Sequence, residues 1–345
     1  MTQQTPWLGD DEDESPPGEA AADAAQAPDE VELRQVAVTT GLHGQRLDKA
    51  LAQLVPEFSR SYLQQLLAQG AVSLNGAAAA KPALKVHAGD ALAVQMRPTQ
   101  QSQAFKPEHL PLDVVHEDEH LLVVNKPAGL VVHPAPGNWS GTLLNALLGR
   151  DAQAALVPRA GIVHRLDKDT SGLMVVARTR AAMDALVRLI AAREVSRQYL
   201  ALAWGAWSGP AQRRVDAPIG RDPRNRLRMA VVDLAQHPGK PARTDFELLD
   251  GNGQACLVRC SLHTGRTHQI RVHMASLRHP LVADALYGGA CGAGLERQAL
   301  HAFRLAFTHP MSGQALEFGA PLPQDMAQAV QTWGLHYNAP MAVRP

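Results

Sequence analysis

A polar segment at residues 160–180, AGIVHRLDKDTSGLMVVARTR, places carboxylate, basic and hydroxyl side chains between two apolar runs. Residues 167–170, DKDT, fit the Asp-x-Asp-x-Thr pattern of phosphotransferases, in which the first aspartate is a nucleophile that acts with Mg²⁺. That chemistry requires an apolar strand before the first aspartate and a later acidic pair for the metal. The sequence has HRL before Asp167 and no such acidic cluster downstream, only the isolated Asp284, so phosphoryl transfer is not favoured.

A zinc site is the second chemistry that the side-chain types suggest, because four histidines crowd one region. They are His263, His268, His273 and His279. Their spacings of five, five and six residues do not place them on one helical face, which requires three or four. Cys256 and Cys260 are four residues apart on a predicted strand and do not form a Cys-x-x-Cys motif. We therefore predict no metal site.

The remaining chemistry needs a single carboxylate without a metal. Asp167 follows Arg165 by two residues, so on an extended chain both side chains point to the same side. A paired arginine keeps an acid ionised for use as a nucleophile or a base. A turn at residues 169–172 would leave Asp167 at the end of a strand, with Lys168 and Asp169 as turn and surface groups. The residues themselves leave open whether Asp167 is catalytic or a structural ion-pair partner.

The segments that must position these side chains have mixed helix and strand signals. Residues 120–134, HLLVVNKPAGLVVHP, predict a hairpin of two strands around a Lys-Pro-Ala-Gly turn. Helices are predicted at 141–150, at 179–194 with Met183, Leu186, Val187 and Ile190 on one face, and at 267–277 with Thr267 as cap; strands are predicted at 197–207 and 255–262. Hairpins mixed with helices predict an α+β fold around a mixed, largely antiparallel sheet.

Residues 36–98 predict a smaller α/β unit ahead of this region. The apolar positions of its two predicted helices are Leu47, Leu51 and Leu54, then Tyr62, Leu66 and Leu67. Ser59 is the predicted cap of the second helix. Asn75 and Gly76 predict a tight hairpin turn, and residues 90–96 a closing strand. The basic side chains around this unit are Arg46, Lys49, Arg60, Lys81 and Lys85.

The rest of the chain divides by composition. Residues 1–33 carry ten acidic residues and no lysine or arginine, which predicts a disordered acidic tail. Without them the chain has 33 basic and 23 acidic residues, a formal charge of +10 that suits a protein binding a polyanion. Residues 99–110 are predicted to be a linker, 111–330 a second domain and 331–345 a C-terminal extension.

Composition also excludes several classes of protein. No apolar stretch approaches the roughly 18–20 residues of a membrane span. The N-terminus has neither the basic region nor the apolar region of a signal peptide. Three cysteines in 345 residues do not make a disulfide framework. We expect a reduced, cytoplasmic protein that does not bind a membrane.

Residues 164–172, HRLDKDTSG, are one of several motifs that follow each other along the chain. They resemble the central motif of the RluA-type pseudouridine synthases. Residues 125–134 resemble the first motif of that family, 239–249 one of its strands and 264–289 its third motif. The unit at 36–98 resembles the S4 RNA-binding domain that many members carry. The resemblance implies the pseudouridine synthase fold, with the second domain as the catalytic one and a small S4-like domain before it.

The resemblance also implies roles for individual residues. Asp167 matches the catalytic aspartate, Tyr199 the tyrosine that stacks on the target base, and Arg271 the arginine that pairs with the aspartate. Arg165 matches the arginine that fills the space left by the flipped base, and the neighbouring His164 is expected to bind substrate. Uridine inside folded RNA must be extruded before it reacts, which gives each role a physical purpose. The substrate-binding residues expected in the S4-like unit are Arg46, Arg60 and Lys85.

The implied function is isomerisation of specific uridines of 23S rRNA to pseudouridine. The N1–C1′ bond breaks, the uracil turns and C5 bonds to C1′, so we expect no cofactor and no metal. Asp167 either attacks a carbon of the nucleoside or removes a ribose proton, and the sequence leaves both open. The expected partner is 23S rRNA, in the large ribosomal subunit or its precursor, and the protein is expected to be a monomer. The alternative is a non-catalytic RNA-binding ribosome-assembly factor, which would not need Asp167, Tyr199 and Arg271 together.

Overall fold

The computed structural model describes residues 32–56, 60–96, 104–135 and 137–337. They form two compact units, and the division falls between Ala104 and Phe105. Four predictions concern residues outside the described ones: most of the acidic tail, the linker up to residue 103, the helix cap at Ser59, and the C-terminal extension from residue 338. No helix in the described parts of the chain is long and apolar enough to cross a membrane.

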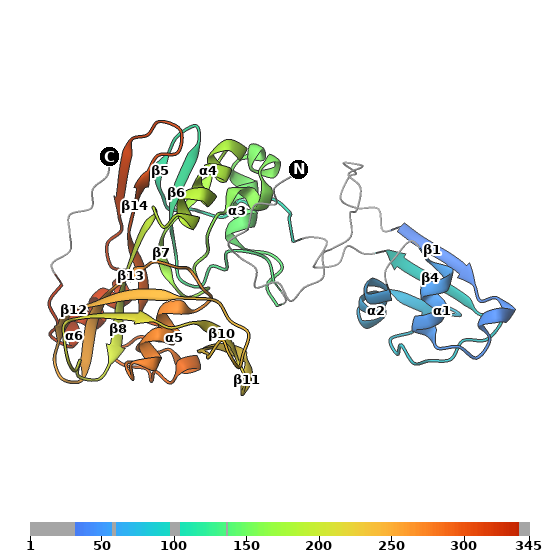
Figure 1. Ribbon diagram of the computed structural model, residues 1–345. Helices are drawn as coiled ribbons and strands as arrows, with labels where there is room; N and C mark the ends of the chain where they lie inside the picture. The colour runs from blue at the N-terminus through green and yellow to red at the C-terminus, as the bar shows by residue number, and fades with distance from the viewer. Residues whose placement is uncertain (1–31, 57–59, 97–103, 136, 338–345) are drawn as a thin grey trace. The chain divides into compact units, whose positions relative to one another are not determined.

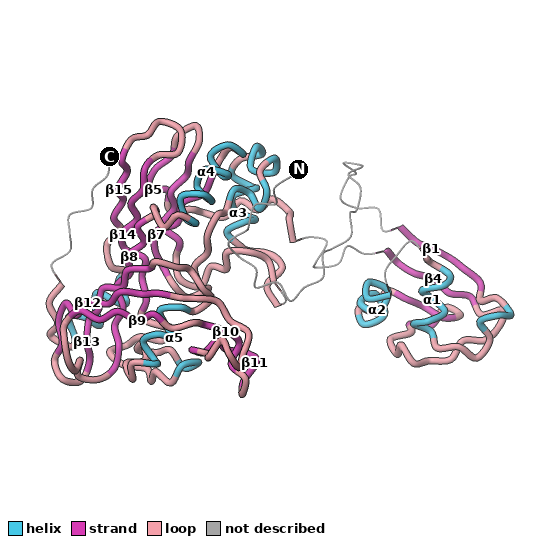
Figure 2. The backbone as a smooth tube through the Cα atoms, viewed as in Figure 1, coloured by secondary structure: helices cyan, strands magenta, loops and turns pink. Residues whose placement is uncertain are grey.

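The smaller unit is a four-stranded antiparallel sheet with two helices (Figures 1 and 2). The strand order is β1 (Glu32–Ala37), β4 (Ala91–Met96), β2 (Val72–Leu74) and β3 (Ala77–Ala78), and the helices are α1 (Leu47–Leu54) and α2 (Arg60–Ala68). The two predicted helices and the closing strand are confirmed. Strand β1 begins inside the predicted tail, because Glu32–Ala37 pairs residue for residue with β4.

The turn between β2 and β3 follows from two residues. Asn75 and Gly76 have φ angles of 51° and 80°, the left-handed values that a two-residue type I′ turn requires. The Asn75 side chain donates to Asp90 at 2.9 Å and accepts from the amide of Ala91 at 2.8 Å. The predicted tight turn is confirmed.

The larger unit is built on one nine-stranded sheet in the order β5-β6-β7-β14-β8-β13-β12-β9, with β15 paired to β14. The strands are β5 (Val114–Glu117), β6 (Leu121–Lys126), β7 (Ser171–Ala177), β8 (Ser196–Trp204), β9 (Gln212–Asp216), β12 (Arg243–Gly251), β13 (Ala255–Leu262), β14 (Leu300–Thr308) and β15 (Ala315–Gly319). Among the described pairs, β7 and β14 are parallel and the others antiparallel. The predicted α+β fold around a mixed, largely antiparallel sheet is confirmed.

Helices cover this sheet, and a separate hairpin stands beside it. The helices are α3 (Leu143–Arg150), α4 (Arg180–Ala191), α5 (Gln269–Ser276) and α6 (Gln324–Thr332), the hairpin strands are β10 (Ile219–Asp222) and β11 (Asn225–Val231), and the short 3₁₀ helices are η1 (Thr40–Leu42), η2 (Ala152–Leu156), η3 (Pro158–Gly161) and η4 (Ala285–Tyr287). Alternate residues of β7 enter two separate cores. Val175 packs with Met183 and Leu186 of α4, which confirms the predicted apolar face of that helix. Met174 packs in the other core, together with Tyr199 of β8.

The hairpin predicted at residues 120–134 forms only its first strand, β6. Strands β5 and β7 occupy both edges of β6, so no edge is left for a returning strand. The carbonyls of Val131 and Val132 instead accept from the amides of Leu143 and Leu144 at the start of α3. The first amides of a helix have no partner within the helix and need one elsewhere. Because the Val131 and Val132 carbonyls serve α3 in this way, the segment does not form the strand that its local sequence predicted.

Gly172, the second residue of β7, is predicted to be intolerant of a side chain. Its φ is 118°, and a Cβ there would lie 2.2 Å from the carbonyl oxygen of Ala302 on β14. Gly172→Ala should therefore lower the free energy of unfolding of the larger unit by about 2–4 kcal/mol. Urea unfolding followed by tryptophan fluorescence measures this change, since residues 32–104 contain no tryptophan.

Gly313→Ala is the matched control. Gly313 also has a positive φ, 74°, but an added Cβ would meet nothing within 4 Å. Its cost should therefore stay near the intrinsic strain of that backbone conformation, about 1 kcal/mol. Equal decreases in the free energy of unfolding of the two variants would contradict a specific clash at Gly172.

Candidate active site

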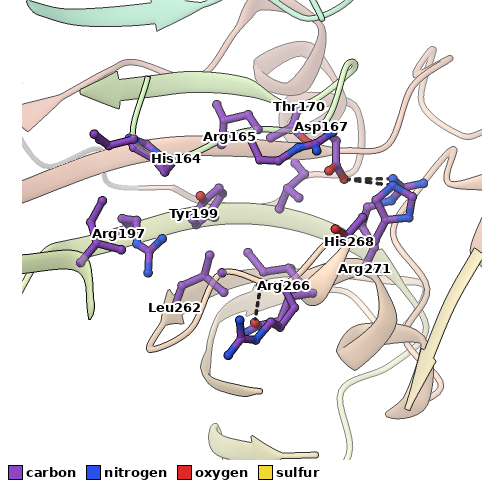
Figure 3. A pocket seen from close by; sticks show the side chains of 18 of the residues that line it. His164, Arg165, Asp167, Thr170, Arg197, Tyr199, Leu262, Arg266, His268 and Arg271 are labelled. Atoms are coloured by element: carbon purple, nitrogen blue, oxygen red, sulfur yellow. Dashed lines mark hydrogen bonds and ion pairs between the residues drawn. The ribbon is translucent and has the colours of Figure 1, made fainter. Parts of the chain in front are cut away.

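One pocket of about 180 Å³ in the larger unit collects most of the residues that the sequence singled out. It is bounded by the loop before β7, by β8, and by the turn and helix that follow β13 (Figure 3). The predicted site residues that line it are His164, Arg165, Asp167, Tyr199 and Arg271. The other three predicted residues, Arg46, Arg60 and Lys85, belong to the smaller unit.

Asp167 lies in the loop that leads into β7. The amide of Thr170 donates to the Asp167 carbonyl at 3.1 Å, which closes a turn, and β7 starts at Ser171. The sequence predicted the turn two residues later, with Asp167 at the end of a strand. That placement is wrong, because the turn includes Asp167 and the strand follows it.

The cation that contacts Asp167 is Arg271. Its Nη1 donates to Asp167 Oδ2 at 3.0 Å, the contact that the resemblance implied. The alternation argument had pointed to Arg165 instead. Across the described ranges, Arg165 makes no hydrogen bond or ion pair, and its side chain is exposed. The argument failed because the chain at residues 163–167 is not a strand.

A second carboxylate holds Arg271 in place. Nε and Nη2 of Arg271 donate to Asp284 at 2.8 and 2.9 Å, a bidentate pair. The Asp284 side chain is 1% exposed and that of Arg271 8%, so one buried guanidinium bridges two carboxylates. Burial lowers the pKa of Arg271, but the bonds to Asp284 and the charge of Asp167 outweigh it and hold that pKa above its ordinary value. Asp284, which the sequence left isolated, therefore orients the partner of Asp167.

His268 and Tyr287 form a hydrogen-bonded pair beside Asp167. The amide of Met229 donates to the Tyr287 hydroxyl oxygen at 3.1 Å, and the same hydroxyl is hydrogen-bonded to His268 Nδ1 at 2.8 Å. His268 Nε2 lies 3.9 Å from Asp167 Oδ2. Burial lowers the pKa of His268, so the imidazole is neutral at pH 7.

His268 is also the N-cap residue of α5, where the sequence wrongly predicted Thr267. The backbone of His268 is left-handed, with φ of 55°, and this residue separates the preceding turn from the helix.

Tyr199 forms a wall of the pocket from β8. It is 5% exposed and packs in the same core as Leu166 and Ile270. Burial raises the pKa of Tyr199 to about 12, while Arg197 opposes and Asp167 adds to the shift. The hydroxyl therefore stays protonated at neutral pH. Figure 3 shows Tyr199 between Arg197 on one side and Asp167 on the other, so its ring borders the space that leads to the carboxylate.

Lys126, at the end of β6, is a buried cation that the sequence analysis missed. Its side chain is 1% exposed, and Nζ donates to the carbonyls of Pro127, Leu130 and Lys168 at 2.9, 2.8 and 2.9 Å. Burial lowers the pKa of Lys126 to about 7, and two nearby aspartates oppose that shift. The ammonium joins the turn after β6 to the loop of Asp167. A lysine at the end of the apolar run LLVVNK was the available signal.

In the smaller unit, one buried carboxylate holds two of the predicted RNA-binding arginines. Asp48 accepts from Arg46 Nε at 3.0 Å, Arg60 Nη2 at 2.5 Å and Gln64 Nε2 at 3.2 Å. These bonds hold the pKa of Asp48 well below its usual range. The two arginine side chains remain 49% and 51% exposed, so their other N–H groups face solvent. Lys85, also exposed, pairs with Arg46 through a backbone bridge.

Two of the four crowded histidines, His273 and His279, bond to groups outside the pocket. Within the described residues, no group of three or more His, Cys, Asp or Glu side chains could hold a metal ion. His273 lies 2.9 Å from the Thr244 hydroxyl, and His279 lies 3.0 Å from the Trp204 carbonyl. Their ring nitrogens are therefore committed to separate partners.

Comparison with known proteins identifies the class that this fold and site define. Residues 120–276 match the RNA pseudouridylate synthase family, and residues 45–92 match the S4 domain. Relatives that are about half identical over most of the chain show the same family. The chain belongs to the RNA pseudouridylate synthase family and is a pseudouridine synthase with an S4 domain.

Two relatives carry the name ribosomal large subunit pseudouridine synthase D. The protein from Neisseria meningitidis serogroup B is 50% identical over 296 residues, which cover 83% of this chain and 78% of the relative. The protein from Nitrosomonas europaea is 49% identical over 323 residues, which cover 91% of each chain. The structure of human RNA pseudouridylate synthase domain containing 4 has a TM-score of 0.53 at 23% identity, covering 65% of this chain and 94% of that one. This structure shows the shared fold.

Asp284→Asn should reduce turnover of a uridine substrate by about 10- to 100-fold, the effect of losing a charged hydrogen bond worth about 1.5–3 kcal/mol. An amide cannot accept both N–H groups of Arg271, so the guanidinium would lose its fixed pose beside Asp167. Single-turnover rates measure the loss. Asp184→Asn, which breaks only the surface pair with Arg180, is the control. Wild-type rates for Asp284→Asn would mean that Arg271 does not need this anchor.

Asp48→Asn should weaken RNA binding by about 3- to 10-fold and flatten its salt dependence, because Arg46 and Arg60 would lose their fixed positions. The substitution removes a negative charge, so net charge alone predicts the opposite change. Asp90→Asn alters the charge of the same unit equally and is the matched control. Filter binding across a salt series compares the two, with circular dichroism to check folding. Tighter binding by both variants would show that Asp48 acts only through charge.

Proposed function

We propose that this pseudouridine synthase modifies uridines of 23S rRNA in the large ribosomal subunit or its precursor. The names of the relatives and the S4 domain support this substrate. The observation that carries the catalytic assignment is the Asp167 carboxylate, fixed 3.0 Å from Arg271 in a pocket walled by Tyr199. This arrangement supplies one carboxylate, one fixed cation and one aromatic face.

Each residue has a defined task in that reaction. Arg271 donates to Asp167 and fixes the orientation of its carboxylate, which would attack a carbon or remove a ribose proton. Tyr199 offers its buried ring as a surface on which an extruded uracil stacks. Arg165 is exposed at the pocket, so it is free to enter the RNA where the base had been.

The target within the rRNA is proposed from two further segments. Residues 157–179 and 297–310 resemble the D-type large-subunit enzymes. We propose the stem-loop of helix 69 as substrate, at uridines 1911, 1915 and 1917. The protein would act as a monomer in the cytoplasm, without a cofactor or a metal.

Two basic surfaces fit such an RNA. The first is the Arg46, Arg60 and Lys85 surface of the smaller unit. The second is the β10–β11 hairpin, which carries exposed arginines at Arg221, Arg224 and Arg226. The base of this hairpin is tied to the site, since the Met229 amide bonds to Tyr287. Exposed arginines position a nucleic acid through its phosphates.

Asp167→Asn should lower pseudouridine formation in a helix-69 stem-loop by at least about 100-fold, the usual contribution of a positioned acid or base. The amide has nearly the same shape, so RNA affinity and folding should change little. Mass spectrometry of digested RNA measures pseudouridine, and filter binding measures affinity. The assay includes EDTA, so that any activity it detects is independent of metal.

Asp169→Asn, in the same loop, is the control and should retain activity. Turnover by Asp167→Asn close to the wild-type rate would remove the catalytic assignment. Binding of the stem-loop by the wild-type protein without any pseudouridine formation would support the alternative, a non-catalytic ribosome-assembly factor. Pseudouridine at other 23S uridines only would overturn the choice of helix 69 and keep the enzyme.

A further inference from the structure

Arg197 is a buried cation without a partner in the described part of the chain. It lies on β8, two residues before Tyr199, and is 7% exposed. Its Nε is fully covered and makes no hydrogen bond, and the guanidinium forms no ion pair with any described residue. A buried charge without a partner is costly. Such a group is expected to have its partner in a ligand.

The guanidinium borders the pocket at the end away from the catalytic carboxylate. Arg197 lines the pocket, and Figure 3 shows it on the side of Tyr199 opposite Asp167 and Arg271. The turn after β13 leaves room for it, because a Cβ on Gly265 would lie 3.0 Å from Arg197 Nη1. The absence of a side chain at Gly265 therefore makes room for the Arg197 guanidinium in the pocket wall.

His164 adds a second free donor at the same end of the pocket. Its Nε2 accepts from the amide of Val175 at 3.1 Å, so the imidazole hydrogen is on Nδ1. Nδ1 is buried and has no partner. Burial, together with the charge of Arg197, lowers the pKa of His164 to about 3, so the ring is a neutral donor.

We propose that Arg197 and His164 bind the carbonyl edge of the extruded uracil, and that the Arg197 guanidinium stabilises the negative charge of the uracil while it is detached from ribose. The inference rests on the proposed function. When the N1–C1′ bond breaks, its electron pair stays on the uracil, whose carbonyl oxygens share the charge. When C5 bonds to C1′, C5 loses its proton and N1 gains one, so charge balances without a cofactor. Attack by Asp167 on C1′ and removal of a ribose proton by Asp167 both pass through this anion.

A phosphate of the RNA backbone is the other anion that a guanidinium binds. The position of Arg197 favours the base, because the side chain is buried beside Tyr199 and shares the pocket with the apolar Ile190 and Leu262. A backbone phosphate stays at the surface of the RNA, whereas an extruded uracil enters the pocket. Fixed donors aimed at developing charge in a dry site are an effective form of catalysis.

The test compares Arg197→Met, which keeps the length and removes the charge, with Arg197→Lys, which keeps a charge. Arg259→Met, on the neighbouring strand β13 and paired with Glu247 outside the pocket, is the matched control. Single-turnover kinetics on the stem-loop separates the rate at saturation from RNA affinity. We expect Arg197→Met to lower the saturated rate by about 10²–10³-fold, with affinity within two- to three-fold of wild type, and Arg197→Lys to recover part of the rate.

Thermal melting separates this role from a structural one. Removing an unpartnered buried charge should leave the melting temperature of Arg197→Met equal to or above that of the wild type. A fall of several degrees, or a variant that does not fold, would make Arg197 a structural residue and overturn the inference. Weaker RNA binding with an unchanged saturated rate would assign Arg197 to a phosphate and overturn it too. Full activity of Arg197→Met beside an active wild type overturns this inference alone, whereas an inactive wild type overturns the proposed function and the inference with it.

Discussion

One guanidinium, shared between two carboxylates, is the interaction on which the site depends. Arg271 joins α5 to Asp284, 13 residues away, and to Asp167, 104 residues away. A cation taken out of water needs compensation on all sides, and Asp284 supplies it through two bonds. Asp167 gives only one oxygen to the network, because Arg271 and His268 both lie on its Oδ2 side. The remaining oxygen, Oδ1, makes no hydrogen bond to any described residue.

The smaller unit uses the inverse arrangement. There a single buried acid, Asp48, fixes two arginines, and those arginines stay half exposed. In the larger unit two acids fix one arginine that is almost wholly covered. The difference in burial decides what each group does. The half-exposed guanidinium groups of Arg46 and Arg60 keep N–H donors that a polyanion in solvent could reach. The buried guanidinium of Arg271 instead uses its donors to orient a carboxylate.

Local signals in the sequence predicted local structure well. Helical spacing, the Asn75-Gly76 turn and the strand at residues 255–262 each depend on neighbouring residues, and all three are confirmed. The errors involve partners that are distant in sequence: both edges of β6 are already occupied, and Arg271 rather than Arg165 meets Asp167. The candidate site came from matched motifs and not from spacing. Lys126 was missed although it ends an apolar run, whereas a single Tyr287 in a short helical turn carries no pattern.

The hydrogen-bond chain from Met229 through Tyr287 to His268 affects where protons are held around Asp167. It holds the imidazole with Nε2 toward Asp167. Arg271 presents an N–H, and Tyr199 keeps its hydroxyl hydrogen at neutral pH. The carboxylate thus stands as an acceptor among donors. In the proposed reaction, a ribose proton removed at this end of the pocket would go to Asp167, because Arg271 and Tyr199 already carry their hydrogens.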